Sequence, residues 1–311
     1  MYTNTNIKAK VILCSENLYV AGARIYTFEL EYPRFIHGEF MTHRQFSRNA
    51  ASSRAIPISK VIEDIQNNPA QPVWYGKKQS GMQAVEQLSE DDINYVKEVI
   101  KITRNQSIAA ARVLDNADLH KQVTNRILEP YQMIKVIVTT TELDNFFWLR
   151  DHKDAQPEIQ VLAKLMQDAI EDYWMKTGVQ FLCAGQWHLP YVHCEKTRSD
   201  DQIYFDENGN VISLNEARMI SASCCAQVSY RKNDGSLEKA EDIFNRLINS
   251  DRVHASPTEH QATPIQPVLN PLDYFNVDGI SAFNKKLEPL SGNLKWFIQY
   301  RQLIPNNVKE D

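Results

Sequence analysis

The chain has 311 residues, of which 43% are hydrophobic, and this is enough apolar material for a folded globular core. Its net charge of -5 argues against nonspecific nucleic-acid binding as the main activity, because affinity for the phosphate backbone needs clustered cations in excess. The chain has no apolar run long enough to span a membrane and no secretion signal at its start, so we predict a cytoplasmic protein.

The first half of the chain alternates between strand and helix patterns. Residues 9–33 are rich in β-branched and aromatic side chains, which favours strand. Residues 89–128 carry apolar residues at helical spacing, and Pro130 ends this helical block. Residues 134–141 form a short β-branched run, which predicts a buried strand.

Two more helices and a turn follow. Residues 142–150 and 155–176 predict helices, and the second carries an apolar stripe typical of a helix that faces a core. Residues 183–209 lack clear periodicity, and Asp-Glu-Asn-Gly-Asn at 206–210 predicts a hairpin-like turn. We place a soft boundary within this segment.

The five cysteines are odd in number and irregularly spaced, which is typical of reduced thiols rather than of a disulfide framework. Two of them share a short segment with two histidines, and together these four could be tested as a zinc set: Cys183, His188, His193 and Cys194. The C-x4-H-x4-H-C spacing matches no familiar zinc module, so we favour an ordered aromatic loop and predict no metal.

The last third of the chain predicts helices over 214–230 and 236–249 and then a loop-rich section punctuated by prolines. A final helix is predicted over 293–303.

One stretch, residues 42–54, carries the strongest chemical signal and reads Thr-His-Arg-Gln-Phe-Ser-Arg-Asn-Ala-Ala-Ser-Ser-Arg. Arg44, Arg48 and Arg54 supply forked donors that suit phosphate, and the serines add hydroxyl groups. Neither glycine-rich phosphate-loop motif occurs in the chain, so side chains are expected to hold the anion. A phosphorylated ligand is the first hypothesis, and a solvated basic loop is the alternative.

The stretch resembles the signature of the flavin-dependent thymidylate synthases, R-H-R-x-x-S-x-N-x-x-S-x-R, with Thr42 in place of the first arginine. The matched positions are His43, Arg44, Ser47, Asn49, Ser52 and Arg54. Three later segments resemble further pieces of that family in the same order, so the resemblance spans residues 28–160. These segments are Arg126-Ile-Leu-Glu-Pro130, Asn145-Phe-Phe-Trp-Leu-Arg150 and Ala155-Gln-Pro-Glu-Ile159.

The resemblance implies an α+β fold, with a mixed or antiparallel sheet flanked by helices, in a homo-oligomer, the family's tetramer. It implies FAD-dependent C5-methylation of a deoxypyrimidine monophosphate, dUMP to dTMP, with methylene-tetrahydrofolate as carbon donor and NADPH as reductant. Arg150 would lie against the pyrimidine as the catalytic residue. Substrate contacts are implied for Glu39, Ser52, Ser53, Arg54, Arg126 and Arg150. Cofactor contacts are implied for His43, Arg44, Ser47, Asn49, Asn145, Ser229, His254, Ser256 and Glu259.

A flavin-binding motif of the family, H-E-T-P-F-E-H, normally precedes the signature but has no match before His43. A similar sequence, His254-Ala-Ser-Pro-Thr-Glu-His260, occurs far downstream. We therefore predict a rearranged or circularly permuted member in which residues 254–260 return to residues 43–54. A proline-capped loop is the alternative. Residues 1–180 would form the nucleotide- and flavin-binding core, and residues 181–311 would pack into the same globular unit.

Three departures from the family pattern leave the substrate open: Thr42, Glu39 and Ala50. They keep a hydroxymethylase, or another pyrimidine C5-alkylating enzyme, as an alternative. A catalytically inactive nucleotide-binding homologue is a second alternative, and a nucleic-acid-binding module is a third that the net charge disfavours.

Overall fold

The centre of the molecule is a mixed five-stranded sheet. The computed structural model describes residues 6–229, 232–250 and 252–309. The strand order is β3-β4-β2-β1-β5, and all neighbours are antiparallel except β1 and β5. The strands are β1 (Lys8–Asn17), β2 (Arg24–Pro33), β3 (Ser47–Ala50), β4 (Met133–Thr140) and β5 (Gln180–Leu182). The predicted strand region 9–33 is therefore two strands joined by a turn, in which Gly22 adopts a positive φ of 79°.

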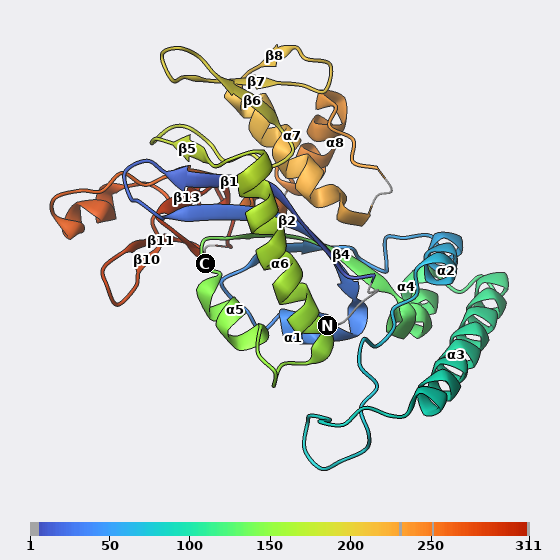
Figure 1. Cartoon of the computed structure of the whole chain (residues 1–311). Coiled ribbons are helices and arrows are strands. Elements are labelled where there is room, and N and C mark those ends of the chain that lie inside the picture. The colour runs from blue at the N-terminus through green and yellow to red at the C-terminus, as the bar shows by residue number, and fades with distance from the viewer. Residues whose placement is uncertain (1–5, 230–231, 251, 310–311) are drawn as a thin grey trace.

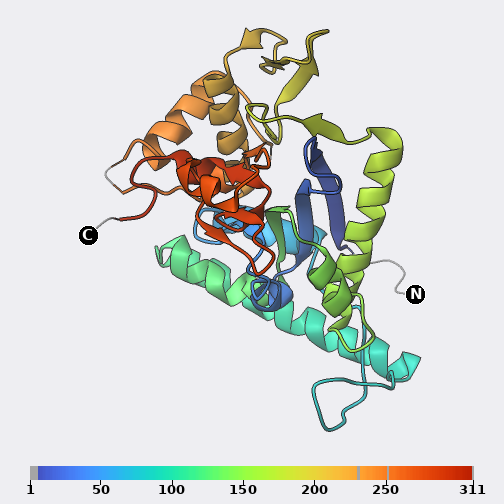
Figure 2. The ribbon, with the colours of Figure 1, turned by 90° about the vertical axis from the view of Figure 1, so that its left-hand side faces the viewer.

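Helix α6 (Pro157–Lys176) covers one face of this sheet, and the C-terminal third of the chain lies on the other side (Figures 1 and 2). The apolar stripe of α6 shares one core cluster with alternate residues of β2 and β4, and the helix itself lies nearest to β1. The main core includes Phe28, Leu30, Val136, Val138, Leu162 and Met166. The short helix α5 (Asp144–Arg150) follows β4 and leads into α6.

A smaller apolar cluster joins α2 (Ile58–Asn67) to the long helix α3 (Glu90–Asn116). Helix α3 begins at the N-cap Ser89, whose hydroxyl accepts from the Asp92 amide. It is followed by α4 (Lys121–Thr124) and the 3-10 helix η2 (Asn125–Tyr131), which ends one residue after Pro130. The helical block predicted over 89–128 is therefore one long helix followed by two short pieces.

The C-terminal third combines two helices with short strands. Strands β6 (His193–Lys196), β7 (Gln202–Phe205) and β8 (Val211–Ile212) form a meander, and the Asp206 carboxylate accepts from two backbone amides in the predicted turn. Helix α7 (Leu214–Ala226) begins with a capping box between Ser213 and Glu216 and continues into η3 (Gln227–Ser229). Helix α8 (Leu237–Leu247) packs on α7.

The predicted helix over 293–303 is wrong. This segment forms β12 (Leu294–Lys295), β13 (Phe297–Gln299) and the 3-10 helix η6 (Tyr300–Leu303). Trp296 has a positive φ of 62°, which ends β12, and β13 then pairs with β9 (Ala262–Pro264). Pairing with a strand more than 30 residues away overrides the local helical pattern. The remaining small elements are η1 (Arg34–Ile36), α1 (His37–Phe40), η4 (Ser256–Glu259), η5 (Pro271–Asn276), β10 (Ala282–Phe283) and β11 (Pro289–Ser291).

A fully buried row of polar side chains crosses from the sheet to the C-terminal third. The Ser15 hydroxyl lies 2.8 Å from His188 Nδ1, and His188 Nε2 lies 2.9 Å from the Thr27 hydroxyl. The Thr27 hydroxyl lies 2.7 Å from that of Thr139, which lies 2.9 Å from His260 Nδ1. We call these five residues the buried polar row; it links β1, β2 and β4 to the segments around β9.

The predicted α+β class is confirmed, with a mixed sheet and flanking helices. Among the described residues, no helix combines the length and apolar character needed to cross a membrane.

Candidate active site

Arg150, at the end of α5, is held by Glu39 of α1 and by Thr42 and His43 of the segment that links α1 to β3. Its Nε donates to His43 Nε2 at 2.8 Å, and its Nη2 donates to the Thr42 hydroxyl at 3.3 Å. Its Nη1 makes a close ion pair with the Glu39 carboxylate. We call Glu39, Thr42, His43 and Arg150 the Arg150 cluster. Two of the three departures from the family pattern, Glu39 and Thr42, thus contact the guanidinium directly.

His43 is neutral at physiological pH. Its burial, together with the nearby cations of Arg150 and Arg48, lowers its pKa to about 4. A neutral ring accepts a hydrogen bond, as the contact with Arg150 Nε requires. The ring packs edge-on against Phe146 of α5, with 4.8 Å between ring centroids. The apolar contacts therefore fix the position of the cluster, and hydrogen bonds fix its orientation.

The three arginines of the signature stretch lie in different surroundings. Arg48 Nη1 donates to the carbonyls of Phe40, Met41 and His43, so this guanidinium holds the turn after α1. Arg44 and Arg54 are exposed, and neither makes a side-chain hydrogen bond or ion pair with another described residue. Arg44 and Arg54 are thus the two arginines of the stretch whose guanidinium N–H groups are free to bind an anion.

Strand β3 lies against η4, which places the downstream motif beside the signature. The Ser47 hydroxyl donates to Asn293 Oδ1 at 2.9 Å and accepts from Gln299 Nε2 at 3.1 Å. Gln299 Nε2 also lies 3.2 Å from the carbonyl of Glu259. The Glu259 carboxylate pairs with Arg301. The structure therefore brings residues 256–260 next to residues 47–49, although more than 200 positions separate them in sequence.

The end of α7 and η3 also contact the signature. Asn49 Nδ2 donates to the carbonyl of Cys225 at 3.1 Å. The amide of Ser52 donates to the Ser229 hydroxyl at 3.1 Å. Ser229 is thus held at the signature through its side chain.

Ser229→Ala is expected to lower the free energy of unfolding by about 1 kcal/mol, because the Ser52 amide loses its acceptor in a half-buried position. Urea denaturation of the two proteins measures the difference. Ser199→Ala, which removes an exposed hydroxyl, is the matched control. Equal free energies of unfolding for the Ser229 variant and wild type would contradict a stabilising hydrogen bond between Ser229 and the Ser52 amide.

A third group surrounds Glu129 of η2. Its carboxylate Oε1 accepts from the buried Ser53 hydroxyl at 2.6 Å and from Arg126 Nη1 at 2.8 Å, and Arg34 Nη1 lies 3.7 Å away. A cavity of about 360 Å³ borders this group and is lined by Arg34 and Ser229. Arg126 therefore lies with Ser53 rather than in the Arg150 cluster.

Other predicted cofactor residues have exposed side chains that bind no other described residue. They are Asn145, His254 and Ser256. The sequence interpretation missed Gln299, Asn293 and Glu129, whose partners are distant in sequence. No motif included Gln299 or Asn293, which lie in the segment wrongly predicted as a helix. Glu129 lies within the quoted segment 126–130, where only Arg126 was given a role.

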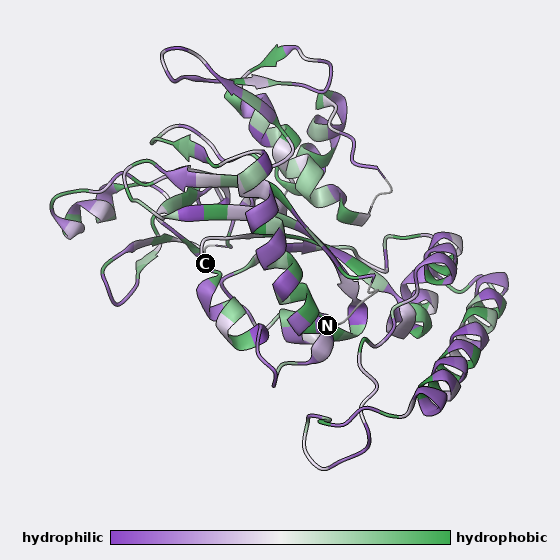
Figure 3. Cartoon of the chain, in the orientation of Figure 1, coloured by the Kyte–Doolittle hydropathy of each residue, from purple (hydrophilic) through white to green (hydrophobic). Residues whose placement is uncertain are grey.

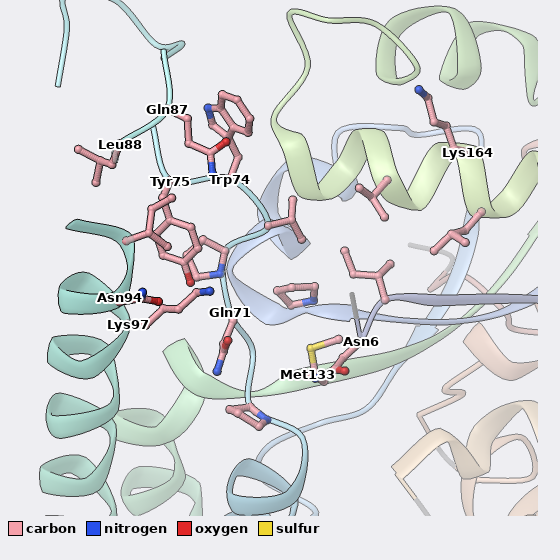
Figure 4. Close-up of a pocket in the computed structure, with 18 of the residues that line it drawn as sticks. Asn6, Gln71, Trp74, Tyr75, Gln87, Leu88, Asn94, Lys97, Met133 and Lys164 are labelled. Carbon is pink, nitrogen blue, oxygen red and sulfur yellow. The ribbon is translucent and has the colours of Figure 1, made fainter. Parts of the chain in front are cut away.

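A larger cavity, of about 1430 Å³, lies between α3 and α6 (Figure 4). It is lined by Trp74, Tyr75, Lys97 and Lys164, and it contains none of the predicted site residues.

Four of the five thiols, those of Cys14, Cys194, Cys224 and Cys225, are poor candidates for nucleophiles. Burial raises the pKa of Cys14 to about 11 and that of Cys224 to about 12. It also raises the pKa values of Cys194 and Cys225. A thiol with a raised pKa is protonated at neutral pH and therefore weakly nucleophilic.

A family model described as thymidylate synthase complementing protein matches residues 20–174. The chain belongs to this family. The match includes the signature stretch and the whole Arg150 cluster, and the family is one of thymidylate synthase-like methyltransferase enzymes. A comparison with curated protein sequences finds no match.

Two solved structures illustrate what the chain is similar to. One is the UMP/dUMP methylase PolB from Streptomyces cacaoi bound with 5-Br dUMP, at 16% identity, over 54% of this chain and 91% of that one, with a TM-score of 0.46. The other is thymidylate synthase ThyX from Helicobacter pylori with FAD and dUMP, at 20% identity, over 47% of this chain and 67% of that one, with a TM-score of 0.33.

Proposed function

We propose that the protein catalyses FAD-dependent C5-methylation of a deoxypyrimidine monophosphate, dUMP to dTMP, with methylene-tetrahydrofolate as carbon donor and NADPH as reductant. Membership of the thymidylate synthase complementing family supports this reaction. Within the structure, one observation carries the proposal. Arg150, which lies 107 positions from His43 in sequence, donates to its ring, and this contact places a fixed guanidinium at the signature.

Arg150 would stabilise the reacting ring. Any route that polarises or attacks the C5–C6 bond of a uracil builds negative charge on the ring carbonyls. A fixed guanidinium stabilises this charge without reorganising at the moment of reaction. The ion pair with Glu39 and the contact with His43 hold the fork in one orientation, while its remaining N–H groups are available to the base.

The phosphate of the substrate would be held by the Arg54 guanidinium and the Ser52 hydroxyl, which follow β3. Arg126 of η2 would be a further contact. FAD would be held by exposed donors whose side chains bind no other described residue: Arg44, Asn145, His254 and Ser256. These side chains fit the cofactor, since the guanidinium of an arginine suits a diphosphate. Gln299 joins the Ser47 hydroxyl of β3 to the Glu259 carbonyl of η4, and Asn49 holds β3 to α7, so the role of these residues would be to shape this surface. Bound FAD would supply the hydride that reduces the transferred carbon.

The test is a purification followed by an assay. The protein is expected to bind FAD, measured by its visible absorbance, and to convert dUMP to dTMP when methylene-tetrahydrofolate and NADPH are added, measured by mass spectrometry. Protein that neither carries nor takes up FAD would contradict the proposal and would favour the inactive nucleotide-binding homologue.

Transfer of a hydroxymethyl group is the second candidate. The observation that favours it is that Arg150 already contacts Glu39 and Thr42. The Glu39 carboxylate adds a negative charge next to the proposed site of the pyrimidine ring. The mass of the product separates the two reactions in the same assay.

The proposal also includes a homo-oligomer, the family's tetramer, acting in the cytoplasm. Residues 1–180 and 181–311 would act as one unit, and the contacts of Ser229 and Gln299 with the signature support this.

A further inference from the structure

Helix α3 is largely uncovered in the single chain. Only Ile93, Ile108 and Ala111 are buried among its 27 residues. Its N-terminal half borders the cavity of about 1430 Å³ through Ile93, Asn94 and Lys97, so little of the body of the molecule supports that half (Figure 4). A helix of this length usually gains its stability from an apolar face that packs on a neighbour.

The exposed side of α3 carries such a face. Tyr95 is 72% exposed, Val99 41%, Ile102 54% and Val113 67%. Figure 3 shows α3 as mainly hydrophilic, with apolar residues among the polar ones. With the exposed Gln106 and Ala109, the positions alternate in steps of four and three, which is the spacing of a coiled-coil seam. We call Tyr95, Val99, Ile102, Gln106, Ala109 and Val113 the α3 seam.

We propose that the α3 seam packs, antiparallel, on the α3 seam of a second copy of this chain. This inference does not depend on the proposed reaction. A two-fold axis near Arg104 would set Tyr95 opposite Val113, Val99 opposite Ala109 and Ile102 opposite Gln106 of the second copy. Each larger side chain then faces a smaller or more flexible one, and the same patch serves both copies, as a two-fold interface requires.

The charges beside the seam favour a second copy of this chain as the partner, and they favour the antiparallel orientation of the two helices. Glu98 and Arg112 each precede a seam residue by one position, where flanking charges set partner and orientation. In the antiparallel arrangement Glu98 lies next to Arg112 of the second copy, and this pair occurs twice. In a parallel arrangement the flanking residues are Thr103 and Ala117, which carry no charge. Glu98 also pairs with Lys101 of its own helix, and both side chains are exposed, so Glu98 remains accessible.

The experiment measures the mass of the full chain in solution by sedimentation equilibrium across a concentration series. Wild type is expected to form at least a dimer. Ile102→Lys is expected to weaken that association at least tenfold, because it buries an unpaired charge in the seam. Asp115→Lys, on an exposed position of α3 outside the seam, is the matched control and should associate like wild type. Circular dichroism checks that each variant is folded.

A charge exchange tests the direction. Glu98→Arg alone and Arg112→Glu alone are each expected to weaken association, and the double variant is expected to restore it to near the wild-type level. A monomeric wild type would overturn the proposal and would mean that another partner covers the seam. Unchanged association of the folded Ile102→Lys variant would also overturn the proposal. So would a double variant whose loss of association free energy equals the sum of the losses in the two single variants.

Discussion

Arg150→Ala is expected to lower kcat by about 100-fold or more and to leave FAD affinity unchanged. The proposed partner of the guanidinium is the pyrimidine ring, so its loss removes stabilisation of the transition state and not of the bound cofactor. Steady-state assays give kcat, and a fluorescence titration of FAD gives the affinity. Arg150→Lys is expected to recover only part of the activity, since an ammonium keeps the charge but not the planar fork that contacts Glu39, Thr42 and His43.

Arg198→Ala is the matched control, because that arginine is exposed and far from the signature in sequence. Full turnover in the Arg150→Ala variant would remove Arg150 from its catalytic role. Joint loss of turnover and FAD binding would show instead that Arg150 holds the cofactor-binding surface together.

The free energy of unfolding is expected to fall steeply as the pH drops from about 6.5 to about 5. Burial lowers the pKa values of His188 and His260 to about 3, whereas the unfolded chain titrates near the ordinary value of 6.5. Between these values the unfolded chain binds more protons than the folded protein, so acid favours unfolding. His43, whose pKa is lowered to about 4, adds to this effect. Each histidine contributes at most about 1.4 kcal/mol per pH unit, reached once the unfolded ring is fully protonated, so the three together lose roughly 5 kcal/mol over this interval.

In this pH interval the histidines change the free energy of unfolding and the carboxylates do not. The folded state lowers the pKa values of Glu16 and Glu288, so their contribution is lost only as the pH falls below the ordinary carboxyl value of 4.5. Urea denaturation at a series of pH values measures the slope. His260→Gln is expected to lower this slope by about a third, because it removes one of the three contributing rings, and His193→Gln, which changes an exposed ring, is the matched control. A flat profile in wild type would show that the three rings titrate normally.

Local patterns predicted those elements whose faces are set by nearby residues. The apolar stripe of α6 and the β-branched run of β4 both pack as their periodicity requires. The pattern failed at 293–303, because distant pairing with β9 decides the conformation there. The core, the central strands and most helices were thus accessible from sequence, and the small C-terminal sheets were not.

The candidate site divides in the same way. The signature spacing predicts His43, Ser47 and Asn49 as site residues, and in the structure all three side chains bind residues distant in sequence. It did not show that Thr42 and Glu39 would contact Arg150, because a hydrogen bond across more than 100 positions leaves no periodic trace. Arg48 was interpreted as an anion ligand, yet its donors serve three backbone carbonyls of its own turn.

The contact of Gln299 with Ser47 has a consequence for how the protein is made. A span of 252 positions separates the two residues, so the ribosome synthesises the signature stretch long before the segment that covers it. At translation rates of about 5 to 20 residues per second, the nascent chain exposes β3 for roughly ten seconds or more. An edge strand open for that time can pair with another chain. Chaperone occupancy should therefore decline only once the segment that contains Gln299 is free to pack on β3.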